Sequence, residues 1–283
     1  MTKPILVRTM SRAELDIAID WAAAEGWNPG LQDATAFHAT DPGAFLVACR
    51  DDQPVACISV TRYGEDFGFL GFYIAHPSAR GQGYGIQVWR AGMERLAGRN
   101  IGLDGVVAQQ GNYRKSGFTL AWRNIRYEGS FTDFNAHDPA ITLLDASTLP
   151  FDWLSAFDRR FFPAARTTFL SLWISLPCHR ARVALRDGEI VGFAVARPCR
   201  RGTKIGPLYA DDTQCALALL AALDTPDLQR PVIIDVPETN KAAVKLVESF
   251  AFAPAFETAR MYTGPAPAID MQRLFGVTTF ELG

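Results

Sequence analysis

The feature of this sequence that most constrains its fold is an order of strand and helix patterns that occurs twice. In each half, a strand leads to a helical stretch, a hairpin, a further strand, a helix, a strand, a short helix and a last strand. Val55 and Val191, which follow the two hairpin turns, are 136 residues apart, and Phe118 and Phe252, which begin the two last strands, are 134 residues apart. Because insertions would change such spacing, the sequence predicts a duplicated α+β unit. The alternative is a chance agreement among common alternating elements.

The expected elements divide into two sets of similar size. Strands are expected at residues 5–9, 44–50, 55–62, 67–75, 103–108 and 118–127, and again at 140–144, 181–185, 190–196, 204–209, 232–236 and 256–262. Helices are expected at residues 11–25, 83–97, 110–116, 151–176, 212–223 and 240–250. Residues 129–139 lack apolar periodicity and are rich in turn formers, so we expect one domain at 1–130 and a second at 138–283.

Composition narrows the class of protein. The chain has 283 residues, of which 48% are hydrophobic and 20% charged, as in a soluble globular protein. A net charge of −2 without long runs of one sign argues against broad binding of nucleic acid or anionic membranes. The first residues do not resemble a signal peptide, and the five scattered cysteines indicate a reducing compartment. We therefore expect a cytoplasmic protein, monomeric or homodimeric, that binds no metal.

A glycine-rich loop follows the strand expected at 67–75. It reads Arg80-Gly81-Gln82-Gly83-Tyr84-Gly85 and precedes an amphipathic helix. Glycines between a strand and a helix let several backbone N–H groups converge on an anion, and the helix dipole and an arginine add positive charge. The loop lacks the Gly-Lys-Ser/Thr of a P-loop, and a dinucleotide fingerprint would need glycine at Ile86. The sequence therefore predicts a diphosphate site of another kind.

Two motifs together resemble the GNAT superfamily of N-acetyltransferases. Its first signature, Arg/Gln-x-x-Gly-x-Gly/Ala, is matched by Arg80, Gly83 and Gly85, and its second, Tyr-x-x-x-Gly-Phe, is matched between Tyr113 and Phe118. The resemblance implies an α+β (α/β mixed) fold of two tandem units, each a mixed, mostly antiparallel twisted sheet flanked by helices. One departure is that Val106 and Gln109 replace an Asn-x-x-Ala found in relatives, and Asn112 can substitute for the missing asparagine.

The resemblance also implies a cofactor and its contacts. Acetyl-CoA is the expected co-substrate, bound by the strand before the loop, the loop itself and the following short helix, at Tyr73, Ile74, Ala75, Arg80, Gly81, Gln82, Gly83, Tyr84, Gly85, Asn112 and Lys115. Arg114 and Lys115 are candidates for its 3′-phosphate, a solvated helix face being the alternative. Tyr113 is the expected general acid, because a phenol can protonate a departing thiolate. Its alternative role is as a packing side chain.

The second half keeps the family pattern incompletely. Asn240 and Ala243 preserve the Asn-x-x-Ala spacing, but Val247 stands at the tyrosine position. Asp211 and Asp212 occupy the place of the phosphate loop and would repel a diphosphate. This resembles a tandem-GNAT (YitH-like) arrangement with a degenerate C-terminal unit that contributes to the acceptor pocket.

The general base is left open by the sequence. The candidates are carboxylates near expected cleft positions or a water molecule; the side chains are Glu65, Asp66, Asp33 and Glu238. The leading hypothesis is transfer of an acetyl group from acetyl-CoA to a primary amine of a small molecule through a tetrahedral intermediate. The alternatives are a non-catalytic acyl-CoA-binding sensor and an N-acetyltransferase of proteins or peptides.

Overall fold

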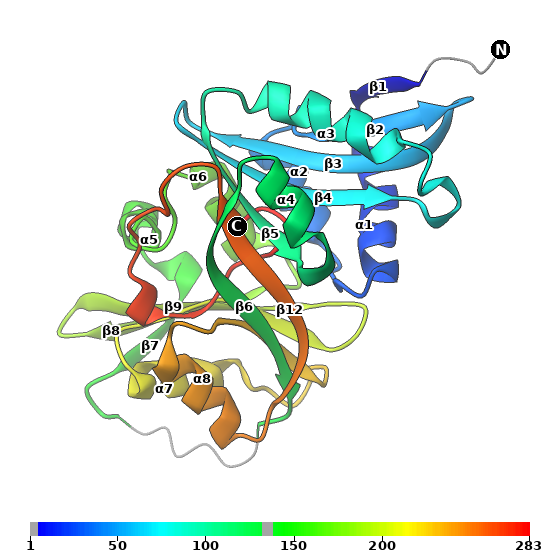
Figure 1. Ribbon diagram of the computed structural model, residues 1–283. Helices are drawn as coiled ribbons and strands as arrows, with labels where there is room; N and C mark the ends of the chain where they lie inside the picture. Colours follow the sequence, from blue (N-terminus) through cyan, green and yellow to red (C-terminus); the bar gives the residue numbers. More distant parts are fainter. Residues whose placement is uncertain (1–4, 132–137) are drawn as a thin grey trace.

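A computed structural model describes residues 5–131 and 138–283, so the expected linker lies partly outside the described residues. Figure 1 shows two groups of helices packed on a sheet that runs through the whole molecule. The strand order is β1-β2-β3-β4-β5-β12-β6-β11-β10-β9-β8-β7, and β13 pairs with β10. The pairs β4–β5 and β10–β11 are parallel, and the remaining pairs are antiparallel. The expected mixed α+β fold is confirmed.

The first half follows the predicted order of elements closely. Its strands are β1 (Leu6–Thr9), β2 (Phe45–Arg50), β3 (Gln53–Tyr63), β4 (Phe67–Ala75), β5 (Asn100–Val106) and β6 (Thr119–Gly129). Its helices are α1 (Arg12–Ala24), α2 (Asp33–Thr40), α3 (Tyr84–Arg95) and α4 (Gln110–Lys115). The predicted capping box is present at the start of α1, where Ser11 and Glu14 bond each other's backbone N–H groups.

The second half repeats that order. Its strands are β7 (Thr142–Asp145), β8 (Arg180–Arg186), β9 (Glu189–Pro198), β10 (Thr203–Ala210), β11 (Val232–Pro237) and β12 (Ala253–Tyr262). Its helices are α5 (Phe151–Asp158), α6 (Thr167–Ser175), α7 (Thr213–Leu223) and α8 (Lys241–Ser249). The single helix expected at 151–176 is wrong: Pro163 lies in the break between α5 and α6, where its ring and missing N–H end a helix.

The two halves exchange their last strands. β12 lies between β5 and β6, and β6 in turn lies between β12 and β11. Residues 258–262 of β12 pair with 102–106 of β5, and residues 124–129 of β6 pair with 232–237 of β11. Figure 1 shows β6 and β12 as long neighbouring strands that join the halves. Each half therefore completes the sheet of the other.

A buried ion pair stabilises this junction. Arg126 on β6 donates two hydrogen bonds to Asp235 on β11, at 2.7 and 2.9 Å, and both side chains are 2% exposed. The same guanidinium lies over the rings of Phe256 and Phe280, at 5.5 and 5.0 Å from their centres, and donates to the carbonyl oxygen of Trp27. One cation thus contacts β11, β12, the C-terminal tail and the loop after α1.

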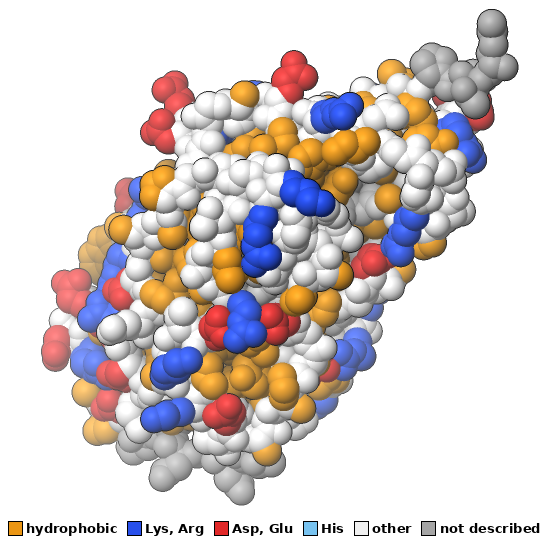
Figure 2. All heavy atoms as spheres, in the orientation of Figure 1, with side chains coloured by type: hydrophobic (Ala, Val, Ile, Leu, Met, Phe, Trp, Pro, Cys, Tyr) orange, Lys and Arg blue, Asp and Glu red, His pale blue; other side chains and the backbone are white. Residues whose placement is uncertain are grey.

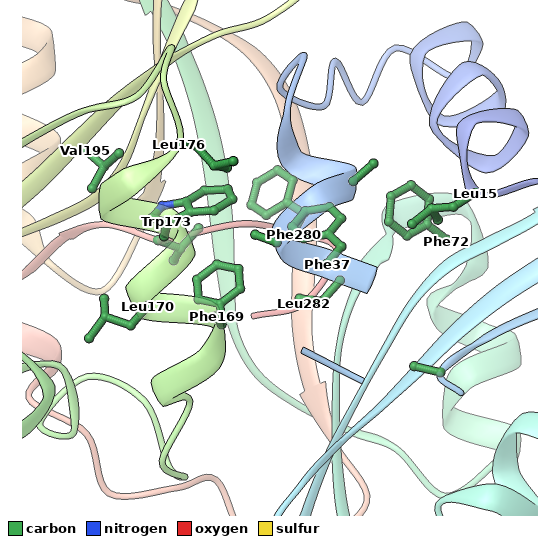
Figure 3. Packing of buried hydrophobic residues seen from close by; sticks show 14 of the residues in the cluster. Leu15, Phe37, Phe72, Phe169, Leu170, Trp173, Leu176, Val195, Phe280 and Leu282 are labelled. Atoms are coloured by element: carbon green, nitrogen blue, oxygen red, sulfur yellow. The ribbon is translucent and has the colours of Figure 1, made fainter. Parts of the chain in front are cut away.

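The C-terminal tail runs into the core instead of over the surface. Its first part is β13 (Leu274–Gly276), and all residues from 274 to 283 are buried. Tyr63 donates to the carbonyl oxygen of Leu282, and Arg166 donates to that of Gly283, both at 3.0 Å. Figure 1 places the C-terminus in the middle of the molecule, and Figure 3 shows Phe280 and Leu282 among core side chains of both halves. The sequence analysis did not predict this segment.

The strand exchange predicts that neither half folds alone. Residues 1–130 without β12, and residues 131–283 without β6, would each expose unpaired apolar strand edges, which favour aggregation. We expect each fragment alone to lack cooperative thermal unfolding, followed by circular dichroism, and the two produced together to form one cooperative complex. A monomeric 1–130 fragment that unfolds cooperatively would contradict this interpretation.

Candidate functional site

The candidate site is a notch where two parallel strands part. β4 and β5 pair from Phe67 and Asn100 as far as Leu70 and Leu103 and no further. Beyond that point β4 stays with β3, and β5 stays with β12. Phe72 has a φ of 46°, within an irregularity of the β3–β4 ladder that bends the strand. One edge of β4 is thereby free to bond a ligand.

Three adjoining cavities surround this notch and share Tyr73 and Tyr113. The outer groove has a volume of about 560 Å³ and is lined by Glu25, Trp27, Tyr73, Ile74, Ala75, Arg80, Val106, Ala108, Gln109, Tyr113 and Phe256. The inner cavity lies at the closed end, between Leu70 and Leu103, and also includes Asp104, Thr258 and Phe280 in its wall. The side cleft lies against α3 and α4 and includes Ile86, Asn112 and Lys115.

The glycine-rich loop opens the first turn of α3 to solvent. Gly81 and Gly83 have φ values of 75° and 80°, a conformation that disfavours other residues. Gly83 is the residue before α3, where no side chain caps the helix, and a Cβ atom at either glycine would meet nothing within 4 Å. The backbone N–H groups of this turn are therefore accessible to an anion, and the helix dipole favours negative charge there.

Side chains of the loop are already ordered. The Nε atom of Arg80 donates to the carbonyl oxygen of Ala75 at 3.1 Å, and its guanidinium pairs with Glu25, which follows α1. Gln82 donates to the carbonyl oxygen of Ser78. Both residues thus brace the connection between β4 and α3. Glu25 was missed by sequence reasoning, because nothing in its local pattern distinguishes it from other helix-end carboxylates.

A second cation beside the loop was also missed. Arg50, at the end of β2, donates from Nη1 to the side-chain oxygens of Gln82 and Tyr84, both at 3.3 Å. Its guanidinium lies over the Tyr84 ring at 5.8 Å. On the other side of the loop, Gly85 allows α3 to approach Tyr73, since a Cβ atom there would lie 3.1 Å from the phenol oxygen. The loop thus combines two cations with a close helix–strand contact.

Tyr113 lies where the three cavities meet. Its ring stacks on Trp89 with centres 5.7 Å apart, and it packs so closely on Gly105 that a Cβ atom there would lie 2.3 Å from Cε2. Burial raises the pKa of Tyr113 well above its usual value, and Tyr73 adds to the effect. The phenol therefore stays protonated at neutral pH and can donate a hydrogen bond or a proton.

The short helix α4 brings the remaining predicted contacts to the same region. Asn112 and Lys115 line the side cleft, and the amide of Asn112 donates to Gln109 at 2.7 Å. Val106 and Gln109, which replace the family's Asn-x-x-Ala, line the outer groove. The structure thus brings residues 73–75, Arg80 and the predicted α4 residues to the walls of these cavities, whereas loop residues 81–85 line none of the three.

The predicted carboxylate bases line none of the three cavities. Glu65 and Asp66 lie in the exposed turn before β4, about 30 Å along an extended strand from Ala75. Asp33 is fully buried, pairs with Arg197 at 3.2 Å and accepts from the N–H of Gly30. Glu238 pairs with Arg123 on the surface. Figure 2 shows such acidic and basic side chains interspersed over the face that carries β6 and β12.

Asp104 is a carboxylate of the inner cavity that the sequence analysis missed. It accepts hydrogen bonds from Arg260 on β12, at 2.8 and 2.6 Å, and from Asn124 on β6 at 2.8 Å. Burial raises the pKa of Asp104, although the nearby Arg260 opposes this effect. Asp104, Arg260 and Asn124 together join the neighbouring strands β5, β12 and β6 beside the notch.

The equivalent notch of the second half is filled by the chain itself. β10 and β11 pair only from Thr203 to Ile205, and β13 then pairs with the free end of β10. Val277 donates its N–H to the carbonyl oxygen of Asp235 on β11 at 2.9 Å. The first turn of α7 is capped by the side chain of Asp212, which accepts from the N–H of Cys215. The strand edge and the helix start are thus both occupied here.

Comparisons with known proteins agree with this geometry. A model described as the acetyltransferase (GNAT) family matches residues 13–118, and one described as an acetyltransferase (GNAT) domain matches residues 154–276. The chain belongs to the GNAT acetyltransferase family. The two matches lie on the two halves, which confirms the tandem arrangement, and the protein is an acyltransferase of the N-acetyltransferase type.

Three similar proteins match this chain over most of their own length. A holothin acyltransferase from Pseudoalteromonas sp. (strain SANK 73390) is 29% identical over 96% of this chain and 92% of its own. A putative acetyltransferase from Pyrococcus horikoshii matches all of this GNAT chain and 97% of its own, with a TM-score of 0.83 and 21% identity. A tandem GNAT protein from the clavulanic acid biosynthesis pathway matches 93% of this chain and all of its own, with a TM-score of 0.64 and 15% identity.

The described residues also bear on metal ions and membranes. Within residues 5–131 and 138–283, no group of three or more histidine, cysteine, aspartate or glutamate side chains could hold a metal ion. None of the helices in these ranges combines the length and the apolar character needed to span a lipid bilayer.

His179, beside the buried Asp33, predicts a loss of stability in acid. Its Nδ1 donates to the carbonyl oxygen of Trp173, and burial lowers the pKa of His179 to about 4 from an ordinary value near 6.5. As the pH falls from 6.5 to 4, His179 therefore takes up a proton in the unfolded chain before it does so in the folded chain, and this favours unfolding. We expect protonation of His179 to lower the free energy of unfolding by up to about 3 kcal/mol between pH 6.5 and pH 4.

The measurement is urea unfolding of the wild type and His179→Gln at pH 7 and pH 4.5. The wild type should lose more unfolding free energy than the variant between these pH values. Equal losses would show that His179 does not contribute to the acid sensitivity.

Proposed function

We propose that the first half binds acetyl-CoA and that the enzyme transfers its acetyl group to a primary amine of a small molecule. The observation that carries the proposal is the notch between β4 and β5, together with the loop that connects β4 to the uncapped start of α3. Such a site offers a free strand edge for an extended amide chain and an anion site at its end. The holothin acyltransferase among the relatives supports acyl transfer.

The cofactor's groups match the parts of this site in order. Its diphosphate is placed on the amides of Gly81 to Gly85, with Arg50 and Arg80 as counter-charges, which requires Arg80 to leave Glu25. The pantetheine chain lies in the outer groove and pairs with the free edge of β4 at residues 73–75. Its sulfur then reaches Tyr113, and the acyl group enters the inner cavity.

The chemistry requires a donor for sulfur and a place for negative charge. The amine attacks the thioester carbonyl, and backbone N–H groups of β4 stabilise the oxyanion of the tetrahedral intermediate. Tyr113 donates its proton to the departing sulfur, so that CoA leaves as a thiol. Burial disfavours the phenolate that remains, which regains a proton from the water that takes up the amine proton. The amine proton passes to water in the outer groove, which is lined by Glu25.

The second half is proposed to shape the acceptor pocket without a cofactor of its own. Phe256 of β12 lines the outer groove, from which the amine would approach the thioester. The filled notch between β10 and β11, and the carboxylates Asp211 and Asp212, leave no equivalent diphosphate site there. Domains 1–130 and 138–283 would then differ in role.

The loop assignment predicts that Gly83→Asp abolishes acetyl-CoA binding. The new carboxylate would repel the diphosphate and occupy the open space before α3. Gly98→Asp is the matched control, since Gly98 has the same φ of 80° and equally open surroundings but lies in the turn after α3. Calorimetry should show a loss of affinity of at least about 100-fold for Gly83→Asp alone. Equal affinities in the two variants would contradict the loop assignment.

The acid role predicts that Tyr113→Phe lowers turnover without weakening cofactor binding. Loss of a general acid costs about 10²- to 10⁴-fold in kcat, whereas the phenyl ring keeps its packing on Trp89 and Gly105. The measurement is release of free CoA thiol from acetyl-CoA with a panel of small amines, beside the calorimetric Kd for CoA. Unchanged turnover would exclude the acid role. Tight CoA binding without thiol release by the wild type would indicate a sensor.

A further inference from the structure

The C-terminal tail supplies the far wall of the inner cavity. That cavity lies at the closed end of the notch, where Leu70 and Leu103 still pair, and Phe280 is part of its lining. A cofactor that enters from the outer groove places its acyl group deepest, so this group is what approaches the Phe280 ring. The ring is 6% exposed and comes from a segment that neither GNAT sequence match includes.

Phe280 is held in place from several directions. Its ring lies over the Arg126 guanidinium at 5.0 Å and has its centre 6.4 Å from that of Phe256. The next residue, Glu281, packs its carbonyl group on β4, where a Cβ atom at Gly71 would lie 2.1 Å from the carbonyl oxygen. The tail therefore cannot move towards β4, and the buried pair of Arg126 with Asp235 limits its movement away.

The space left beside the ring is small. The volume open to a water-sized group within the inner cavity is about 20 Å³, and one water needs about 10–15 Å³ on this measure. This is room for one or two heavy atoms beyond the thioester carbonyl. Most of the lining is apolar, so a longer chain is excluded by shape and not by polarity.

We infer that Phe280 is a specificity-determining residue that limits the transferred acyl group to acetyl or propionyl. The inference rests on the proposed function, because it requires acyl-CoA to bind in the notch of the first half. The tail thereby has two roles in one chain: β13 fills the notch of the second half, and Phe280 ends the acyl channel of the first.

The test is calorimetric binding of CoA, acetyl-CoA, butyryl-CoA and hexanoyl-CoA, which needs no knowledge of the acceptor. In the wild type, hexanoyl-CoA should bind at least tenfold more weakly than acetyl-CoA. In Phe280→Ala, butyryl-CoA should bind about tenfold more tightly than in the wild type, since each newly buried methylene contributes about fourfold. The Kd for CoA itself should be unchanged.

Two further variants keep the test decisive if Phe280→Ala fails to fold. Phe280→Leu removes less volume and should change the chain-length preference in the same direction. Phe275→Leu is its matched control, because Phe275 is an equally buried tail residue that packs in the second half and lines none of the three cavities. Identical chain-length profiles in the wild type, Phe280→Leu and Phe275→Leu, with CoA bound by all, would overturn the inference alone. No binding of CoA by the wild type would overturn the proposed function with it.

Discussion

The structure depends on the reciprocal exchange of β6 and β12 between the halves. β5 is bonded on one edge to β4 only as far as Leu103, and on its other edge to β12 from Gly102 to Val106. Beyond Leu103, a strand from the second half holds β5 while β3 holds β4, so the two walls of the notch are fixed from outside. The opening is thus maintained by the duplicated architecture together with the bend of β4 at Phe72.

The same architecture contains two equivalent notches, one that is open and one that is filled by the chain. Gly71 on β4 and Gly206 on β10 each lie against the tail so closely that a Cβ atom would meet its backbone carbonyl oxygens. In the second half the tail adds β13 as a paired strand, and the helix start is capped by Asp212. In the first half the tail stops beside the notch and leaves the edge of β4 free. Asp212 and β13 thus occupy the second-half site, whereas the first-half site keeps the uncapped start of α3.

The sequence predicted what is encoded locally. The element order, the capping box at Ser11 and the glycine loop are patterns of neighbouring residues, and the structure shows each of them. Long-range pairings could not be predicted, because they join distant segments without a spacing signature. Examples are the exchange of β6 and β12 and the pairs Arg50–Gln82 and Asp104–Arg260. The tail was missed because β13 has only three residues and its pairing partner lies on β10.

These pairings make the two halves chemically dependent on each other. Arg126 of the first half holds Phe256 and Phe280 of the second, and it is neutralised by Asp235 of the second half. Removing Asp235 would leave both Arg126 and the buried Lys204, which lies 4.0 Å from the same carboxylate, without their counter-charge, which is strongly destabilising in proteins. The inner wall of the notch therefore depends on Arg126 and Asp235 together, because Arg126 lies over the Phe280 ring of that wall. Trp27 and Phe256 also line the outer groove, so the same buried cation fixes both cavities. The glycine loop is held by contacts within the first half alone, from Arg50 to Gln82 and from Arg80 to Ala75.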